Sequence, residues 1–142
     1  MPRPMTPELA VDVVIELEDR PGRPIVLVLR RNPPAGHAFP GGYVDIGESV
    51  EAAACREARE ETGLVIRLGA LLGVYSDPAR DPRGHTVSLV YIAAASGEPI
   101  AGDDAAGILV VNPDDAPPLA FDHDRILADY LATRRAGRSG HG

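Results

Sequence analysis

The sequence predicts an α/β (α+β) domain in which helices pack on both faces of a mixed β-sheet. Apolar segments of strand length and segments of helix length follow one another without the regular alternation that a parallel sheet requires. The chain has 142 residues, of which 44% are hydrophobic and 25% charged, so it can bury one sizeable core. We therefore expect one domain over residues 1–142, with its core at about 9–133 and a flexible tail at 134–142.

The first third of the chain predicts two neighbouring strands and a loop. Leu9–Leu17 has the β-branched composition of a strand, and Asp19–Pro24 carries the Pro and Gly of a turn. Ile25–Arg31 is then the returning strand. Asn32–Gly42 contains three prolines and three glycines, which argue against a helix and a central strand, so we expect a loop there.

A helix is predicted at Val50–Thr62. Ser49 precedes this segment and is a suitable N-cap, because its hydroxyl can accept from a free backbone N–H of the first turn. Gly63 follows it and is a suitable C-cap. The Ala-rich sequence between the two caps has high helix propensity.

The second half of the chain predicts three further strands and a second helix. The strands are expected at Leu64–Asp77, His85–Ala95 and Ile108–Val111, separated by loops rich in Gly, Pro and Asp. The helix is expected at about Arg125–Thr133, where apolar side chains recur at helical spacing.

Composition narrows the classes of partner. The net charge of −7 argues against nonspecific binding to nucleic acid or to an anionic membrane, since both need a basic face. Cys55 is the single cysteine, so no internal disulfide can form. No apolar run approaches signal-peptide or membrane-spanning character. These features predict a cytoplasmic protein.

The predicted helix at Val50–Thr62 carries an unusual set of carboxylates. At about 100° per residue, Glu57, Glu60 and Glu61 share one face. A solvated surface is the usual interpretation of such a cluster. Here, however, the same stripe contains the apolar residues Val50, Ala53, Ala54 and Leu64. We expect the small residues Ala52, Cys55 and Ala58 to lie opposite and to pack closely, so Cys55 is interpreted as a packing residue.

Three buried carboxylates would repel one another or take up protons unless a cation joined them. Oxygen ligands suit hard divalent ions such as Mg²⁺ or Mn²⁺, and Mg²⁺ commonly shares its coordination shell with substrate phosphates. The preceding Pro40, Gly41 and Gly42 allow a turn that brings backbone groups close to a ligand. The sequence therefore predicts a metal-dependent phosphate site.

The segment from Gly42 to Leu64 resembles the signature of the Nudix hydrolases. The matching positions are Gly42, Glu48, Arg56, Glu57, Glu60, Glu61 and Gly63. The resemblance implies an α/β/α sandwich around a mixed sheet and hydrolysis of a nucleoside diphosphate linked to another group. It also implies Mg²⁺ or Mn²⁺ held by Glu57, Glu60 and Glu61 with backbone help near Gly42. Arg56 is expected to take part in catalysis and Glu48 to support the site.

Further stretches resemble the ADP-ribose pyrophosphatase branch of that family. They are VDVVIE, FPGGYVDIGES, YSDPARDPRGHTVSLVY, AGDDA and LAFDHDRIL. This resemblance implies cleavage of ADP-ribose to AMP and ribose 5-phosphate. Arg31, Arg83 and Asp104 are the candidate substrate-binding residues. Glu60, Asp103 and Asp104 remain alternative general bases.

Two other functions stay open from the sequence. The same catalytic core would serve a nucleoside triphosphate or dinucleoside polyphosphate hydrolase. Some proteins of this fold bind a nucleotide sugar as sensors without cleaving it, although the intact signature argues for an enzyme. By analogy with the family, a homodimer is possible.

Overall fold

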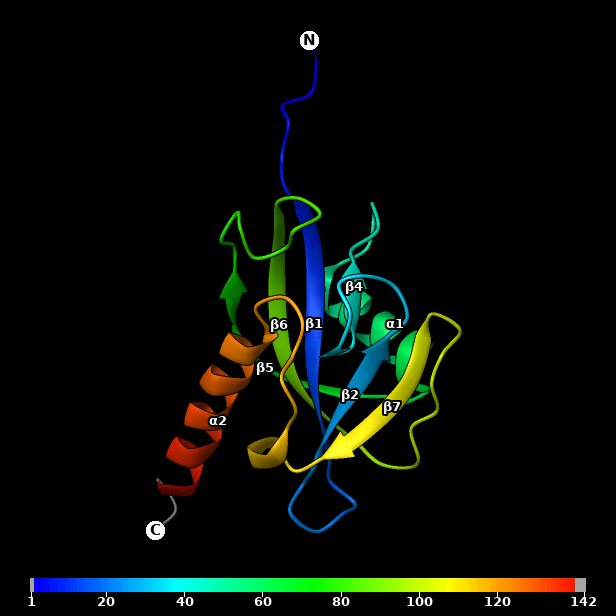
Figure 1. The fold of residues 1–142 in the computed structure, drawn as a ribbon, viewed down its shortest axis with the longest axis vertical. Coiled ribbons are helices and arrows are strands. Elements are labelled where there is room, and N and C mark those ends of the chain that lie inside the picture. The colour runs from blue at the N-terminus through cyan, green and yellow to red at the C-terminus, as the bar shows by residue number, and fades with distance from the viewer. Residues whose placement is uncertain (1, 140–142) are drawn as a thin grey trace.

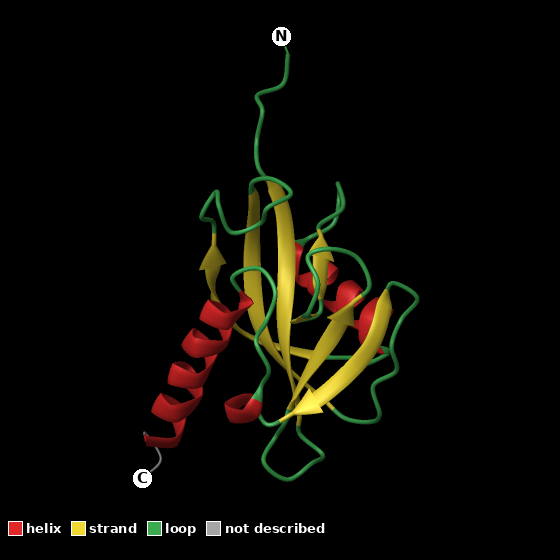
Figure 2. Ribbon diagram, viewed as in Figure 1, coloured by secondary structure: helices red, strands yellow, loops and turns green. Residues whose placement is uncertain are grey.

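The computed structural model describes residues 2–139, and it confirms the expected mixed sheet with helices on both faces (Figures 1 and 2). In chain order the elements are β1 (Glu8–Leu17), β2 (Ile25–Arg30), β3 (His37–Ala38), β4 (Gly41–Tyr43), α1 (Val50–Thr62), β5 (Arg67–Tyr75), β6 (Thr86–Ala95), β7 (Ala105–Val111), the 3₁₀-helix η1 (Pro113–Asp115) and α2 (His123–Ser139). None of the helices in this described part is long and apolar enough to cross a bilayer.

β1 is the central strand, and its pairing explains where a cavity can form. It runs parallel to β6 along its whole length. Its first half pairs antiparallel with β4, and near its end it pairs antiparallel with β2 through Glu16 and Ile25. β2 then diverges from β1 and pairs with β3 and β7 instead. The fork between β1 and β2 leaves room beside β4.

Alternation along β1 builds the two layers of the core. Val11, Val13 and Ile15 face α1 and pack in the same cluster as Ala53, Ala54 and Ala58. Val14 faces the opposite side, where Ile126 and Tyr130 of α2 cover the sheet. This period of two is expected for a strand that is buried on both faces. Figure 2 shows α1 and α2 on opposite sides of the sheet.

The caps predicted for α1 are confirmed. Ser49 accepts a hydrogen bond from the backbone N–H of Ala52, and Gly63 adopts a left-handed φ of 71°. The N–H of Gly63 donates to the carbonyl of Arg59. Local sequence therefore fixes both ends of the helix that carries the carboxylates.

Two predictions about α1 packing are wrong. Ala52 and Cys55 are exposed, whereas Ala58 is buried. The sheet covers only the face of α1 that contains Ala53, Ala54 and Ala58, and the helical rotation places Cys55 beyond the edge of that face.

Several element boundaries also differ from the sequence-based expectation. The expected loop at 32–42 contains β3 and β4, because β2 and β1 supply hydrogen-bonding partners to these short segments. β7 begins at Ala105, ahead of the expected Ile108, because β2 pairs with it there.

The second helix extends beyond the expected Thr133. Residues 134–139, expected to belong to a flexible tail, continue α2, and the rest of that tail lies outside the described residues. Arg134 donates to the carbonyls of Gly22 and Arg23, so the turn between β1 and β2 supports this end of the helix.

Gly102 fixes the loop between β6 and β7 against α1. Its N–H donates to the carbonyl of Glu61 at 3.0 Å, and a Cβ on Gly102 would lie 2.0 Å from the carbonyl oxygen of Glu60. We expect Gly102→Ala to lower the free energy of unfolding by about 1–3 kcal/mol, measured by urea denaturation. Gly107→Ala is the control, since its Cβ would meet nothing closer than 4.0 Å; equal stability of the two variants would contradict this account.

Candidate active site

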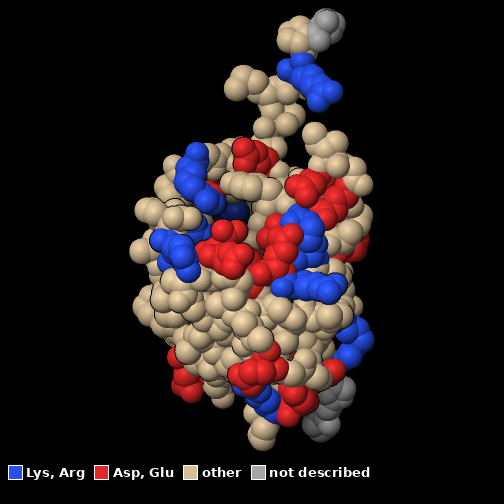
Figure 3. Space-filling view, turned by 90° about the vertical axis from the view of Figure 1, so that its right-hand side faces the viewer, with Lys and Arg blue, Asp and Glu red and all other residues tan. Residues whose placement is uncertain are grey.

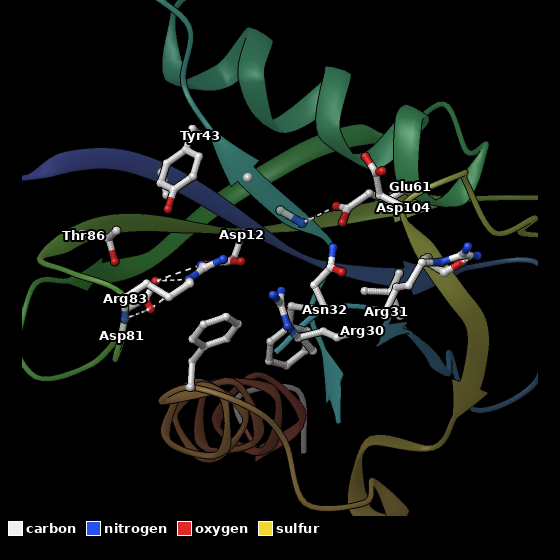
Figure 4. A pocket seen from close by; sticks show the side chains of 18 of the residues that line it. Asp12, Arg30, Arg31, Asn32, Tyr43, Glu61, Asp81, Arg83, Thr86 and Asp104 are labelled. Atoms are coloured by element: carbon white, nitrogen blue, oxygen red, sulfur yellow. Dashed lines mark hydrogen bonds and ion pairs between the residues drawn. The ribbon is translucent and has the colours of Figure 1, made fainter. Parts of the chain in front are cut away.

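A cavity of about 380 Å³ opens where β1 and β2 diverge (Figure 4). β1, β2 and β4 contribute its walls, and segments near residues 80–86, 104–105 and 121 close its rim. The cavity is lined by charged residues of both signs: Asp12, Arg30, Arg31, Glu61, Arg80, Asp81, Arg83 and Asp104. Figure 3 shows acidic and basic side chains interleaved in the upper half of one face of the molecule.

Glu61 is the carboxylate of α1 that reaches this cavity. Its Oε2 accepts a hydrogen bond of 2.6 Å from the N–H of Gly41. Burial raises the pKa of Glu61 to about 8, although the Gly41 N–H opposes the rise, and the charges of Glu57 and Asp12 add to it. Without a cation the structure therefore favours the protonated form of Glu61 at neutral pH.

Glu57 lies behind Gly42. A Cβ on Gly42 would approach the carboxylate of Glu57 to 2.6 Å, so only glycine allows β4 to pass this close to the helix. Burial raises the pKa of Glu57, and Arg56 partly counteracts that effect. The backbone of Gly42 therefore lies against the acidic face of α1.

Arg56 joins the signature residues into one network. Its Nε and Nη2 bind the two oxygens of Glu48 at 2.7 and 2.9 Å. Its Nη1 donates to Glu57 at 2.8 Å and to Glu60 at 3.2 Å. The hydrogen bonds from Arg56, followed by that from the N–H of Asp45, lower the pKa of Glu48 to about 2. This geometry fits Glu48 as a support for Arg56.

The expectation that all three carboxylates are buried is wrong for Glu60. Its side chain is 57% exposed, against 14% for Glu57. Glu60 lies at one edge of the acidic face of α1, and this edge points away from the sheet. Within residues 2–139, no group of three or more acidic, His or Cys side chains already converges on one cation position.

The donor set nevertheless fits a hard divalent cation. All its side-chain donors are carboxylate oxygens, which suit Mg²⁺ or Mn²⁺. Burial raises the pKa of both Glu57 and Glu61, and a bound cation would favour the ionised form of both carboxylates. Glu57, Glu60 and Glu61 with the backbone near Gly42 are the residues that would hold it.

Asp12 is a site residue that the sequence analysis missed. It lies on β1, is 8% exposed and lines the cavity. Ser88 donates to its Oδ2 at 2.5 Å, and Gly41 is paired with it across the sheet. A polar residue within the apolar strand VDVVIE was the available signal, because a buried Asp needs partners.

The three predicted substrate-binding residues all line the cavity, but they differ in orientation. Arg31 turns its guanidinium to the carbonyl of Ala105 at 3.1 Å. Arg83 binds the buried Asp81 through Nε and Nη2. Asp104 lines the cavity together with Glu61, whereas Asp103 is not among its lining residues.

Arg30 and Phe121 also line the cavity. The Nε of Arg30 donates to the carbonyl of Pro34 at 2.7 Å, and its guanidinium lies 4.7 Å from the centre of the Phe121 ring. Phe121 comes from the segment before α2, far from β2 in the sequence, so only the folded chain brings the two together.

The cavity is lined by arginines and lies beside the helix that carries the signature carboxylates. A comparison of the sequence with protein-family models gives a match that agrees with this site. The model describes the NUDIX domain and covers residues 6–130. The chain belongs to the Nudix family. Signature and fold thus agree over most of the sequence.

Three similar proteins place this Nudix hydrolase more closely. An ADP-ribose pyrophosphatase of Methanocaldococcus jannaschii is 47% identical over 128 residues, which are 88% of this chain and 73% of that protein. The NUDIX domain of Shewanella oneidensis NrtR, complexed with ADP ribose, has a TM-score of 0.78 at 27% identity and covers 91% of this chain and 89% of that domain. A MutT/nudix family protein from Enterococcus faecalis has a TM-score of 0.79 at 30% identity, covering 91% of this chain but 62% of that one. This Nudix hydrolase thus spans less than two thirds of the Enterococcus protein.

The raised pKa of Glu61 makes the stability of the metal-free protein depend on pH. Between the ordinary value of 4.5 and about 8, the unfolded chain releases this proton while the native state keeps it. The free energy of unfolding should therefore fall as pH rises through this window, by up to about 1.4 kcal/mol per pH unit.

Urea unfolding in EDTA at about pH 5 and about pH 8 measures this difference. Millimolar Mg²⁺ should reduce it, because a cation offsets the negative charge of the ionised site. Equal or greater stability at the higher pH in EDTA would contradict the burial of an uncompensated carboxylate at residue 61.

Proposed function

We propose that this Nudix hydrolase cleaves the pyrophosphate bond of ADP-ribose to give AMP and ribose 5-phosphate, with Mg²⁺ or Mn²⁺ as cofactor. The observation that carries the proposal is the position of Glu61. Its half-buried carboxylate lines a cavity that is also lined by arginines. The Methanocaldococcus relative and the ADP-ribose complex of the Shewanella domain support this choice of substrate.

The reaction adds water across a phosphoanhydride. One phosphorus–oxygen bond forms from the water oxygen, the bridging bond breaks, and the water proton must be accepted. When bound, the divalent cation neutralises phosphate oxygens and lowers the pKa of the attacking water. Arg30 and Arg83 supply positive charge on the cavity wall, where guanidinium groups can bind phosphate oxygens.

Asp104 is the candidate proton acceptor that the geometry favours. It lines the same cavity as Glu61 (Figure 4). Glu60 is largely exposed and engaged by Arg56, and Asp103 is not a lining residue. Asp104→Asn should therefore lower kcat more than Asp103→Asn does.

A substrate panel with product analysis tests the function. The purified protein is incubated with ADP-ribose, ATP and a dinucleoside polyphosphate in Mg²⁺, and parallel samples contain EDTA. We expect AMP and ribose 5-phosphate from ADP-ribose, the highest kcat/KM for that substrate, and no turnover in EDTA. Preference for ATP or the dinucleotide would favour the alternative hydrolase, and tight binding of ADP-ribose without products would favour a sensor. Homodimer formation and cytoplasmic location remain predictions.

A further inference from the structure

Phe121 adopts a backbone conformation that is unfavourable for its residue type. Its φ is 55°, within the left-handed region that glycine and asparagine occupy far more readily. The turn is held at both ends, since Ala120 donates to the carbonyl of His37 at 2.8 Å and His123 donates to the carbonyl of Ala120 at 3.1 Å. Such strained residues concentrate at binding and catalytic sites.

The side chain of Phe121 is fixed on one side by a buried histidine. The rings of Phe121 and His123 lie 5.4 Å apart. His123 is 3% exposed, and its Nδ1 accepts the backbone N–H of Phe39 at 3.0 Å. The phenyl ring therefore packs against a buried, hydrogen-bonded histidine at the rim of the cavity.

Two guanidinium groups lie against the same ring. Those of Arg30 and Arg83 are 4.7 and 5.1 Å from its centre, within cation–π range. The ring thus brings two like charges close together from β2 and from the loop before β6. Burial lowers the pKa of Arg30, and the nearby charge of Arg83 lowers it further.

The two arginines are not equally neutralised. Arg83 pairs with Asp81 at 2.9 Å. Arg30 binds the carbonyls of Pro33 and Pro34, and it forms no ion pair with any carboxylate of residues 2–139. Excess positive charge therefore lines this wall of the cavity, facing Glu61 and Asp104 on the other side (Figure 4).

We propose that Phe121 is a positioning residue that holds Arg30 and Arg83 at the spacing needed to bind the phosphate groups of the substrate. This inference rests on the proposed function for the identity of the substrate, a nucleoside diphosphate derivative. Planar guanidinium groups match the geometry of phosphate oxygens. An aromatic face limits the rotamers of both side chains and so reduces the ordering cost on binding. The strained backbone at Phe121 directs the ring to this place.

The test compares Phe121→Leu with Phe121→Tyr. Leu has the same β-carbon and therefore the same backbone strain, but it lacks the aromatic face, whereas Tyr retains that face. With ADP-ribose in Mg²⁺, we expect Phe121→Leu to raise KM roughly tenfold with kcat changed less than threefold. The KM of the Phe121→Tyr variant should stay close to the wild-type value.

Binding of AMP and adenosine, measured by calorimetry, separates positioning from a general structural role. Phe121→Leu should weaken AMP, which carries phosphate, and leave neutral adenosine unchanged. An equal loss for both ligands, or no loss for AMP, would overturn the inference. A wild-type protein that binds AMP but does not hydrolyse ADP-ribose would refute the proposed function while leaving this comparison intact.

A double-mutant cycle supplies the second measurement. If Phe121 acts through Arg30, then Phe121→Leu should have a smaller effect on AMP affinity in an Arg30→Gln background than in the wild type. Full additivity of the two substitutions would mean that the ring and Arg30 act independently, which contradicts the inference.

Discussion

Glu61→Gln is expected to lower kcat for ADP-ribose by on the order of a hundredfold or more. The substitution removes the negative charge that a divalent cation needs at the cavity, where Glu61 is the α1 carboxylate among the lining residues. The fold should survive, because a Gln side-chain oxygen can still accept the hydrogen bond from Gly41. Steady-state kinetics with saturating Mg²⁺ measures the effect.

The same variant should be more stable than the wild type in EDTA at about pH 8. Gln removes a carboxylate whose ionisation is opposed by burial, so the cost of burying that charge disappears. Glu51→Gln is the matched control on an exposed position of α1, and it should change neither activity nor stability appreciably. Activity of Glu61→Gln within threefold of the wild type would refute the site assignment.

Arg80→Met is expected to cause the largest loss of stability, about 3–5 kcal/mol in the free energy of unfolding. The Arg80 side chain is 5% exposed and binds both oxygens of Asp122 at 2.9 and 2.8 Å. It also donates to Thr86 at 3.0 Å and lies 4.0 Å from Asp12. Met fills similar space but leaves two poorly exposed carboxylates without their cation.

Arg135→Met is the control for that prediction. Arg135 also pairs with an aspartate, Asp114, at 3.0 Å, but its side chain is 65% exposed. Exposed ion pairs contribute about 0–1 kcal/mol, so this variant should unfold close to the wild type in urea. If both arginine variants lost similar stability, burial of the Arg80 network would not be the cause.

The sequence by itself determined the helix that carries the carboxylates. Ser49, Gly63 and the Ala-rich interior specify α1 through local hydrogen bonds and helix propensity, and these forces do not depend on the rest of the fold. The spacing of Glu57, Glu60 and Glu61 on that helix, with Gly42 before it, indicated the family and its metal chemistry. The β-branched composition of Leu9–Leu17 likewise predicted the strand β1.

The tertiary structure alone decided which charged groups meet. Asp12 reaches the site because the sheet register places it opposite Gly41, and Arg30 meets Phe121 across a separation of 91 positions in the chain. β3 and β4 are strands because distant neighbours complete their hydrogen bonds. Glu60 faces solvent because the sheet covers only part of α1. Long-range pairing and burial are properties of the assembled chain, so no local pattern in the sequence contains them.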